Sequence, residues 1–599
     1  MLRARTLPWF ALLLGACPDG GGRDDSGPAS ASTIIASTSG ETTATSTAEP
    51  LPTSSSPPTT STATPDTTAA PDTTTTDDTT TGDPALPVGR IEIGMWCGPP
   101  LDQLTDERFA EIAAAGFTIV ANACDGTTYV PAYNNTMLAL AQAHGMKAFV
   151  SDQRALAAAV GQDVETNLDA LVADYGAAPA LLAYHLVDEP SAGAFANLGV
   201  AVAGLRARDP AHPGIINLLP DYASPAQFGV ATYDEYLASF LAQVAPDSFT
   251  YDHYNFLIDG TDGPTWFANL ALARGHSLQT ATPFGVYIQA ISYNGHRATT
   301  GPEKRWAALH TLAYGGTAVL YFTYWTPPQT QENFGDGIIG ANGLPSSQYA
   351  DVTAINRTLT LMGRYLGAAT STGVFHNGPL DLYTAPRLPT DPVYIPGPAP
   401  ISVGLFAIDA GAYALLVNRD HVNATSTDVY LSAAPSIMDP ATGEFVPADA
   451  TQDDNGFKVH LDLAPGDGAL FHLPGPVPAG PPGAEAYVGT VRADLGTLSV
   501  VDDAFGAQPL RSAGWDDCPV GTTNLGKQLD SNGFWLCVRD DLAGRVFHLG
   551  NVVADTGHLY RFAGGTISDA GLAGWDTCPT GAMIGRVFTS DGFWLCMDP

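Results

Sequence analysis

The chain has 599 residues, which at roughly 150 residues per domain indicates three or four domains and room for a sizeable core. Its 25 Lys and Arg residues stand against 61 Asp and Glu residues, so the net charge is −36. A chain this acidic repels phosphate backbones, which argues against a nucleic-acid-binding protein. The seven cysteines are an odd number, so one of them is expected to serve outside a disulfide.

The N-terminus has the organisation of a secretory signal. Arg3 and Arg5 precede a short apolar run, which is followed by Leu14-Gly15-Ala16-Cys17. The run is too short to span a bilayer. Leu-Gly-Ala-Cys resembles the lipobox of bacterial lipoproteins, which implies that residues 1–17 are a lipoprotein signal and that Cys17 is lipidated. An ordinary cleaved signal with an incidental cysteine is the alternative. We expect an exported protein that is anchored to a membrane through Cys17. Its location is expected to be the outer membrane or the cell surface.

Residues 18–87 consist mostly of Ser, Thr, Pro, Ala and Asp, with almost no aromatic or large aliphatic side chains. Such a segment cannot bury a core, and it is expected to be a disordered, extended stalk. Its predicted role is to hold the following domains away from the membrane.

Residues 88–370 alternate short apolar runs with helical patterns. The predicted strands are 91–97, 117–122, 147–152, 181–187, 214–219, 249–254, 284–290 and 318–324. The predicted helices are 105–115, 135–144, 164–175, 194–208, 233–244, 265–274, 303–314 and 352–366. Eight strands alternating with eight helices predict an α/β fold of the closed (β/α)₈ TIM-barrel type. A doubly wound open sheet is the alternative, but no Gly-x-Gly-x-x-Gly motif follows the first strand.

Polar and aromatic side chains gather at the carboxyl ends of the predicted strands, where barrels place their active sites. They are Trp96, Asn122, Asp152, Asp188, Glu189, Asn217, Asp252, His253, Tyr254, Gln289, Tyr324 and Trp325. Carboxylates supply acid/base chemistry, and Trp and Tyr rings stack on sugars. This mixture favours an oligosaccharide or polysaccharide as the substrate.

The segment Tyr184-His185-Leu186-Val187-Asp188-Glu189-Pro190 resembles the fourth-strand motif of clan A glycoside hydrolases, in which Asn-Glu-Pro carries the general acid/base. The resemblance implies that Glu189 is the acid/base and that Asp188 stands at the Asn position. Trp325, at the end of the eighth strand, matches the place of the clan's substrate-platform Trp. The domain order, a barrel followed by a β-sandwich, resembles that of family 42 galactosidases.

The chain departs from that clan at the end of the seventh strand, where the clan has its nucleophilic Glu. This sequence has Gln289, which cannot ionise and so cannot attack as a carboxylate. Hydrolysis needs two carboxyl groups, and we take Asp252 as the second one. Asp188, Asp152 and Glu303 are the other candidates. Because neighbouring strand residues face opposite sides, one of Asp188 and Glu189 is expected to face away unless the strand has already ended.

The remaining polar and aromatic residues of this set are expected to contact the sugar, with Gln289 bonding a hydroxyl group. These substrate-binding candidates are Trp96, Asn122, Asp152, Asp188, His253, Tyr254, Gln289, Tyr324 and Trp325. For His253 the alternative is a hydrogen-bonding residue of the barrel wall. The sequence shows no metal-ligand spacing among His and carboxylate residues, so we expect neither a metal nor a cofactor.

Residues 371–473 show short alternating strands typical of a β-sandwich, and 474–485 form a Pro/Gly linker. Residues 486–599 contain two repeats with a Trp-to-Trp period of 60 residues. The simplest disulfides are Cys518–Cys537 and Cys578–Cys596, and Cys97 and Cys124 are expected to pair at neighbouring strand ends. This pairing leaves Cys17 for lipidation. The Trp residues of the repeats serve either as a core or as sugar-stacking platforms.

These features predict a surface-tethered, monomeric glycoside hydrolase acting on an extracellular glycan, with Glu189 and Asp252 as its carboxylate pair. The main alternative is a catalytically inactive barrel that binds glycan, which Gln289 favours. A purely structural surface protein is a third, weaker interpretation.

Overall fold

The computed structural model describes residues 89–598 with short gaps. Those gaps are 126, 330–332, 379–390, 397, 410, 454–455, 476–485, 493–494, 503–505, 513–517, 519–521, 529–532, 540–541, 543, 554–555, 564–565, 573–577, 580–581 and 588–591. The predicted signal with Cys17, the predicted stalk and nearly all of the predicted linker therefore lie outside the described residues.

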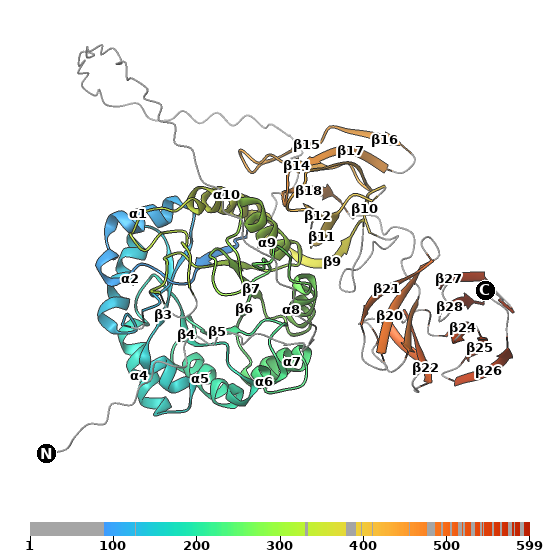
Figure 1. Cartoon of the computed structure of the whole chain (residues 1–599), viewed down its shortest axis with the longest axis horizontal. Coiled ribbons are helices and arrows are strands. Elements are labelled where there is room, and N and C mark those ends of the chain that lie inside the picture. The colour runs from blue at the N-terminus through green and yellow to red at the C-terminus, as the bar shows by residue number, and fades with distance from the viewer. Residues whose placement is uncertain are drawn as a thin grey trace, which may run out of the picture. The chain divides into compact units, whose positions relative to one another are not determined.

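The first part of the described chain is a closed parallel barrel, as predicted. Its eight strands are β1 (Glu92–Met95), β2 (Ile119–Val120), β3 (Lys147–Ser151), β4 (Leu181–Asp188), β5 (Gly214–Leu218), β6 (Phe249–His253), β7 (Phe284–Gln289) and β8 (Ala318–Phe322). Each pairs in parallel with its neighbour, and β1 pairs with β8. The Thr118 N–H donates to the Ile93 carbonyl at 2.8 Å, which joins β1 to β2. Figure 1 shows the helices arranged around these strands.

All eight predicted helices are present. They are α1 (Asp106–Ala114), α2 (Pro131–Ala143), α4 (Val164–Tyr175), α5 (Phe195–Arg208), α7 (Tyr233–Val244), α8 (Trp266–Thr280), α9 (Gly301–Ala313) and α10 (Gln348–Leu366). Four short elements were not predicted, namely α3 (Gln153–Ala159), α6 (Pro225–Phe228) and the 3₁₀ helices η1 (Leu101–Gln103) and η2 (Ala192–Ala194). They are too short to show a hydrophobic period.

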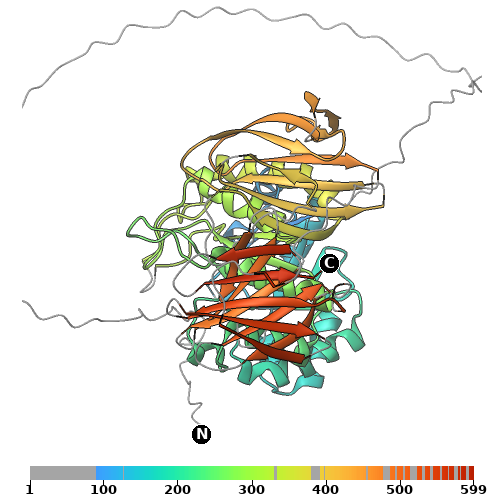
Figure 2. The same ribbon diagram turned by 90° about the vertical axis from the view of Figure 1, so that its right-hand side faces the viewer.

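A sandwich of two antiparallel sheets follows, seen in yellow and orange in Figure 2. One sheet has the order β15-β14-β18-β12-β11-β9 and the other β10-β13-β17-β16. The strands are β9 (Thr370–His376), β10 (Val393–Tyr394), β11 (Ile401–Ile408), β12 (Gly411–Asn418), β13 (Thr425–Leu431), β14 (Ser436–Met438), β15 (Phe445–Pro447), β16 (Ala450–Asp453), β17 (Gly456–Leu463) and β18 (Gly468–Pro474).

The six-stranded sheet is buried on both faces. Ala414 and Leu416 of β12 belong to the core between the two sheets, whereas Leu415 and Val417 belong to the core of the barrel. This alternation follows from the two-residue period of a strand. It explains why α9, which contacts β11 and β12, is buried nearly all round.

The C-terminal part contains two five-stranded sheets of the same topology, β21-β20-β19-β23-β22 and β26-β25-β24-β28-β27. The first repeat has β19 (Ala486–Arg492), β20 (Leu495–Asp502), β21 (Gly506–Ser512), β22 (Thr522–Gln528) and β23 (Phe534–Arg539). The second has β24 (Phe547–Val553), β25 (Thr556–Ala563), β26 (Thr566–Leu572), β27 (Ala582–Val587) and β28 (Phe593–Met597). One apolar cluster contains residues of both repeats, so each repeat completes the core of the other.

Trp535 and Trp594 are fully buried at equivalent positions of the two repeats. Each packs over a glycine that leaves no room for a methyl group: a Cβ atom at Gly489 would lie 1.8 Å from Trp535, and one at Gly550 would lie 2.1 Å from Trp594. These two tryptophans are therefore core residues, one of the two predicted alternatives. Trp515 lies outside the described residues, as does Trp575.

All three predicted disulfides are present. The Cα–Cα distances are 4.8 Å for Cys97–Cys124, 5.7 Å for Cys518–Cys537 and 5.8 Å for Cys578–Cys596. The first joins the loops that follow β1 and β2 at the mouth of the barrel. Each of the other two lies beside the buried Trp of its repeat.

Candidate functional site

Asp188 and Glu189 mark the point at which β4 ends. Asp188 is the last residue of the strand, and Glu189 has a φ of 44°, in the left-handed region that side chains other than Gly rarely adopt. The register between β4 and β5 also shifts between His185 and Val187. Because the strand is irregular here and then ends, strand alternation no longer separates the two carboxylates, and both belong to one cluster.

Asn217, next to last in β5, holds this cluster together. Its Nδ2 donates to Oδ1 of Asp188 at 3.0 Å and to Oδ1 of Asp252 at 3.2 Å, so these two oxygens lie at most about 6.2 Å apart. The Thr250 hydroxyl donates to Asn217 Oδ1 at 3.0 Å, which sets the orientation of the amide. The Asn217 carbonyl accepts the backbone N–H of Glu189 at 2.9 Å. One residue thus positions all three carboxylates.

The Glu189 side chain forms a hydrogen bond with the Asp252 carboxylate. Two carboxyl groups in hydrogen-bond contact must share a proton, as in other carboxylate dyads. The turn after Glu189 is anchored to α7, because the Tyr236 hydroxyl donates to the Pro190 carbonyl at 2.6 Å. The strained backbone of Glu189 is therefore fixed on both sides.

The surroundings of the cluster favour protonated carboxyl groups. Burial, together with the nearby charge of Asp188, raises the pKa of Asp252 to about 7, against the hydrogen bonds that it accepts. Burial raises the pKa of Asp188 to about 6, with the Asn217 amide acting in the opposite direction. Near neutral pH the cluster can hold and release a proton, as a general acid/base requires.

Aromatic side chains line the mouth beside these carboxylates. Trp96 is half-buried and packs edge-on against Tyr287, with ring centroids 5.5 Å apart. Tyr129 lies close enough for the Asp188 charge to contribute, after burial, to raising its pKa to about 12. On the other side, Tyr254 packs against Phe322 at 5.1 Å. Of the predicted sugar-stacking residues, Tyr254 lies near enough to Asp252 and Glu189 for their charges to add, after burial, to raising its pKa, and Trp96 contacts Tyr287, whose pKa Asp188 and Asp252 raise in the same way.

Gln289 does not present its amide to the cluster. Its Oε1 accepts the Phe256 N–H at 3.1 Å, and its Nε2 donates to the Arg297 carbonyl at 2.6 Å. The buried amide thereby ties the loop after β6 to the loop after β7. The predicted hydrogen bond from Gln289 to a sugar hydroxyl would have to displace these backbone partners.

Glu303, one of the candidates for the second carboxylate, is part of the scaffold. Its side chain caps α9 by accepting the Thr300 N–H at 2.8 Å, and it forms a bidentate ion pair with Arg297 at 2.6 and 2.9 Å. Burial alone would raise its pKa, but the Arg297 guanidinium and the Thr300 amide lower it. Glu303 is therefore held in its charged form.

Asn122 and Asp152 are committed to the structure of the barrel. Asn122 Oδ1 accepts the Ser151 N–H at 2.8 Å, and its Nδ2 donates to Asn134 at 2.7 Å. Asp152 caps α3, pairs with the Arg154 guanidinium at 2.8 Å, and accepts the Tyr175 hydroxyl at 2.6 Å. Neither side chain joins the cluster of Asp188, Glu189 and Asp252.

Three further predicted sugar-contacting residues face away from the cluster. His253 lies on the outer side of β6, with its Nδ1 3.0 Å from Asn269 and its ring edge-on to Trp266. Tyr324 is fully buried against Phe117. Trp325 lies under the Arg108 guanidinium, 5.2 Å from its ring centroid. Phe322, two residues before Tyr324, is the aromatic residue of β8 that contacts Tyr254.

Asn217 and Tyr287 have no role that the sequence predicts. Asn217 lies at the end of a predicted strand, but nothing in the sequence shows that it bridges two strands. Tyr287 lies two residues before Gln289, hence on the same face of β7, and it comes close to Asp188 and Asp252. The strand period was the available signal for Tyr287.

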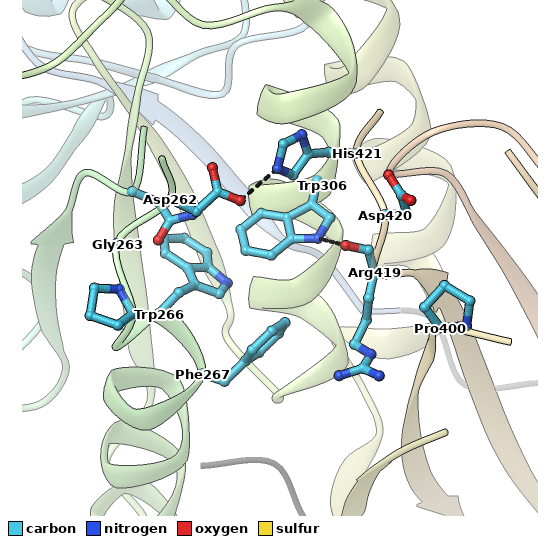
Figure 3. A pocket seen from close by; sticks show the side chains of 11 residues that line it. Asp262, Gly263, Trp266, Phe267, Trp306, Pro400, Arg419, Asp420 and His421 are labelled. Atoms are coloured by element: carbon cyan, nitrogen blue, oxygen red, sulfur yellow. Dashed lines mark hydrogen bonds and ion pairs between the residues drawn. The ribbon is translucent and has the colours of Figure 1, made fainter. Parts of the chain in front are cut away.

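A cavity of about 480 Å³ lies elsewhere, where the loops and helices after β6 and β7 meet the loop between β12 and β13. Figure 3 shows Trp306 between Trp266 and Arg419, with His421 above it and Phe267 below. Trp306 Nε1 donates to the Arg419 carbonyl at 2.9 Å, and His421 pairs with Asp262 at 2.7 Å. None of the predicted site residues lines this cavity. Its contacts join the barrel to the sandwich.

None of the helices within the described ranges has the length and apolarity needed to cross a membrane. Across the same residues, no group of three or more His, Cys, Asp or Glu side chains is arranged to hold a metal ion.

No protein-family model matches the sequence, and no curated protein matches it. Solved structures are similar at low identity. A catalytic mutant of a family 42 β-galactosidase from G. stearothermophilus is 9% identical, with a TM-score of 0.45 over 64% of this chain and 98% of that one. A family 5 glycoside hydrolase from Bacteroides vulgatus is 11% identical, with a TM-score of 0.42 over 64% and 89%.

A β-galactosidase from Marinomonas ef1 is 11% identical, with a TM-score of 0.37 over 47% of this chain. The chain spans 62% of the length of that enzyme. Independently of these similarities, the described residues form a (β/α)₈ barrel with a carboxylate cluster at the carboxyl ends of its strands.

Proposed function

We propose that the protein is a glycoside hydrolase that cleaves an extracellular glycan, with Glu189 as the general acid/base and Asp252 as the second carboxylate. The observation that carries this proposal is the convergence of Asp188, Glu189 and Asp252 around Asn217. Glycoside hydrolysis requires paired carboxyl groups, one of them protonated at the start of the reaction. A buried pair that shares a proton near neutral pH meets that requirement.

In this proposal Glu189 gives its proton to the leaving oxygen as the glycosidic C1–O bond breaks, and the second carboxylate, Asp252, takes a proton from the water that bonds to C1. Asp252, in hydrogen-bond contact with Glu189, keeps the proton on the pair until substrate enters. Trp96 and Tyr254 provide faces against which sugar rings stack. The strained backbone at Glu189 supports a functional role, because residues in the left-handed region concentrate at active sites.

The test is hydrolysis of β-linked polysaccharides and aryl glycosides by the full chain beside its Glu189→Gln and Asp252→Asn variants. Glu107→Gln and Asp102→Asn, at exposed positions, are matched controls. We expect the two site variants to lose activity and the two controls to keep it. If Glu189→Gln is as active as the wild type, Glu189 is not the acid/base.

We also propose that Cys17 carries a lipid that tethers the enzyme at the cell surface. The support is the lipobox resemblance of Leu14-Gly15-Ala16-Cys17 and the pairing of the six other cysteines. The exported protein should partition into membranes, and a Cys17→Ser variant should not. Equal partitioning of the two forms would contradict the anchor.

A second candidate function is an inactive barrel that binds glycan. It is favoured by Gln289, which stands where the resembled clan has its nucleophile and is bonded to backbone groups. Binding of oligosaccharides in calorimetry, with no hydrolysis of any panel member at high enzyme concentration, would support this candidate over the hydrolase.

A further inference from the structure

The cavity between the barrel and the sandwich is a candidate site in its own right. Its volume of about 480 Å³ lies within the roughly 300–1,000 Å³ of small-molecule sites. The loop after β6 contributes to both regions: Tyr254 packs against Phe322 at the barrel mouth, with ring centroids 5.1 Å apart, whereas the next residue, Asn255, lines the cavity. The described residues that line it do not include the carboxylate cluster. The cavity is therefore separate from the candidate catalytic centre.

Two buried polar groups that line the cavity have no hydrogen-bond partner among the described residues. One is the donor Nε1–H of Trp266, a residue that is 3% exposed, and the other is the acceptor Oδ1 of Asn255, which is 2% exposed. Figure 3 shows the nitrogen of Trp266 turned toward Trp306 and Phe267, which also line the cavity. A buried donor or acceptor without a partner is costly. A ligand that both donates and accepts hydrogen bonds would satisfy both groups.

We propose that this cavity is a second glycan-binding site, which takes a sugar unit of an oligosaccharide or polysaccharide. The hydroxyl groups of a sugar both donate and accept hydrogen bonds, so neighbouring hydroxyls can satisfy Trp266 and Asn255 together. The inference goes beyond the proposed function. It shares the class of ligand with that function but not the site, so either can fail without the other.

Aromatic side chains supply the apolar surface that a sugar ring needs. The rings of Trp266 and Trp306 lie with their centroids 5.3 Å apart, and Phe267 lies 5.5 Å from Trp306. The carbon–hydrogen face of a sugar packs on aromatic rings while its hydroxyl groups reach polar side chains. A purely apolar ligand would leave Trp266 Nε1 and Asn255 Oδ1 unsatisfied. The combination of rings, donor and acceptor therefore favours a sugar.

The charged side chains of the cavity favour a neutral ligand. Two acidic residues, Asp262 and Asp420, and two basic residues, Arg419 and His421, line it. His421 Nε2 lies 2.7 Å from Asp262 Oδ2, and the Arg419 guanidinium donates to the Asn377 carbonyl at 2.7 Å. The two signs nearly balance, and each of the two basic side chains already has a partner. An uncharged sugar fits this balance better than a phosphate or a metal ion.

The walls of the cavity are held in place by hydrogen bonds. Trp306 Nε1 donates to the Arg419 carbonyl at 2.9 Å, and the Arg419 N–H donates to the Pro400 carbonyl at 2.7 Å. The Gly263 N–H donates to the Asn255 carbonyl at 2.7 Å, and a Cβ atom at Gly263 would lie only 3.1 Å from Asn255 Oδ1. A side chain at position 263 would therefore crowd the acceptor. A preformed pocket loses little conformational freedom when a ligand binds.

The first experiment titrates the full chain, carrying Glu189→Gln to prevent hydrolysis and labelled with 5-fluorotryptophan, with cellohexaose, xylohexaose, mannohexaose, β-1,4-galactotetraose and chitohexaose. The ¹⁹F NMR signals of Trp266, Trp306 and Trp96 are assigned by their loss in the corresponding Phe variants. The buried Trp594 is the reference. We expect at least one oligosaccharide to shift the Trp266 and Trp306 signals saturably and to leave the Trp594 signal unchanged.

Trp96 distinguishes this inference from the proposed function, because it lies at the barrel mouth. A shift of the Trp96 signal without one of Trp266 or Trp306 overturns the second site and leaves the proposed function standing. Shifts of Trp266 and Trp306, with no hydrolysis of the panel by the wild type, support the second site and count against the hydrolase. No shift of Trp266 with any oligosaccharide overturns the inference.

The second experiment removes the two features assigned to binding, with affinity read from the Trp306 signal. Trp266→Phe keeps an aromatic ring but removes the unpartnered donor, and Gly263→Ala crowds Asn255 Oδ1. We expect each to raise the dissociation constant at least about tenfold. Trp325→Phe, outside the cavity, is the matched control and should leave it unchanged, with melting temperatures recorded for all three. Unchanged affinity in both cavity variants overturns the inference.

Discussion

Both sides of the barrel mouth carry buried carboxylates, but the pKa is raised on one side and lowered on the other. On the β4–β6 side, Asp252 is buried without a cation, and its pKa is raised to about 7. On the β7 side, the equally buried Glu303 is paired with Arg297 and caps α9, so its pKa is lowered. The side chains differ little in chemistry, and their partners decide what each can do.

This difference shows that one barrel can hold both carboxylates that exchange a proton and a carboxylate that stabilises the fold. A buried carboxylate paired with Arg297 is fixed in one charge state and contributes to stability. Carboxylates gathered around the neutral Asn217 amide can exchange a proton, but they cost stability when ionised. The five predictions that follow probe this contrast, beginning with the largest expected effect.

Replacing Glu189 by Gln should lower kcat/KM by about 10³-fold or more, because the proposed acid/base can then no longer carry a transferable proton. The melting temperature should change little, since Gln keeps the size and hydrogen-bonding capacity of Glu. Steady-state kinetics and thermal unfolding measure the two quantities, with Glu107→Gln as the control. A large fall in stability would place Glu189 with the supporting residues instead.

Replacing Glu303 by Gln should lower the stability of the protein and leave its activity nearly unchanged. It leaves the Arg297 guanidinium without its partner and weakens the α9 cap, so unfolding free energy should fall by about 2–3 kcal/mol. Urea unfolding measures this loss. Activity per folded molecule should stay within about threefold of the wild type. An inactive but stable Glu303→Gln protein would show that Glu303 belongs to the reaction.

Asp252→Asn should change the pH dependence of stability. The raised pKa means that the folded protein holds this proton to higher pH than the unfolded chain, so the stability it contributes is complete below about pH 4 and is lost as the pH rises through about 7. The Asn variant should match the wild type at pH 4 and exceed it by roughly 2 kcal/mol at pH 8. Unfolding curves at both pH values check the sign.

Substitutions of Trp96 and Trp325 should distinguish a residue that binds substrate from one that packs inside the protein. Trp96→Ala should raise KM about tenfold by removing a stacking face beside the carboxylates. Trp325→Leu should lower the melting temperature without changing KM, because that ring packs against Arg108. Kinetics of both variants on one substrate suffice, and a raised KM only in Trp325→Leu would reverse the assignment.

The smallest expected effect concerns the backbone at Glu189. Gly accepts a φ of 44° without the strain that a Cβ atom causes, so Glu189→Gly should be about 1 kcal/mol more stable than Glu189→Ala. Both variants lack the carboxylate, which isolates the conformational effect. Equal stability in urea unfolding would mean that no strain is stored there.

The barrel was predictable because its pattern repeats. The predicted strand 181–187 differs from β4 by one residue, and the predicted helix 164–175 coincides with α4. The prediction for β2 was longer than the two residues that pair as a strand, Ile119 and Val120. The 7-residue α3 was missed, because a helix of two turns does not establish a period.

The carboxylates of the site were also predictable, from a motif and from their places at strand ends. Their partners were not. Asn122 and Gln289 resemble ligand-binding amides in sequence, yet Asn122 bonds the backbone of Ser151 at the end of β3 and Gln289 bonds the backbone of the loop after β7. Asn217 and Tyr287 carry no motif, and their importance follows only from which side chains surround them.

By itself, the sequence determined the order of strands and helices, the three disulfide pairs and the identity of the acidic residues at the barrel mouth, because periodicity, cysteine spacing and a short motif are local properties. Only the tertiary structure decided which carboxylates remain able to exchange a proton and which are neutralised. That outcome depends on burial and on the charges and donors brought close by other strands. Asp252 and Glu303 differ for this reason alone.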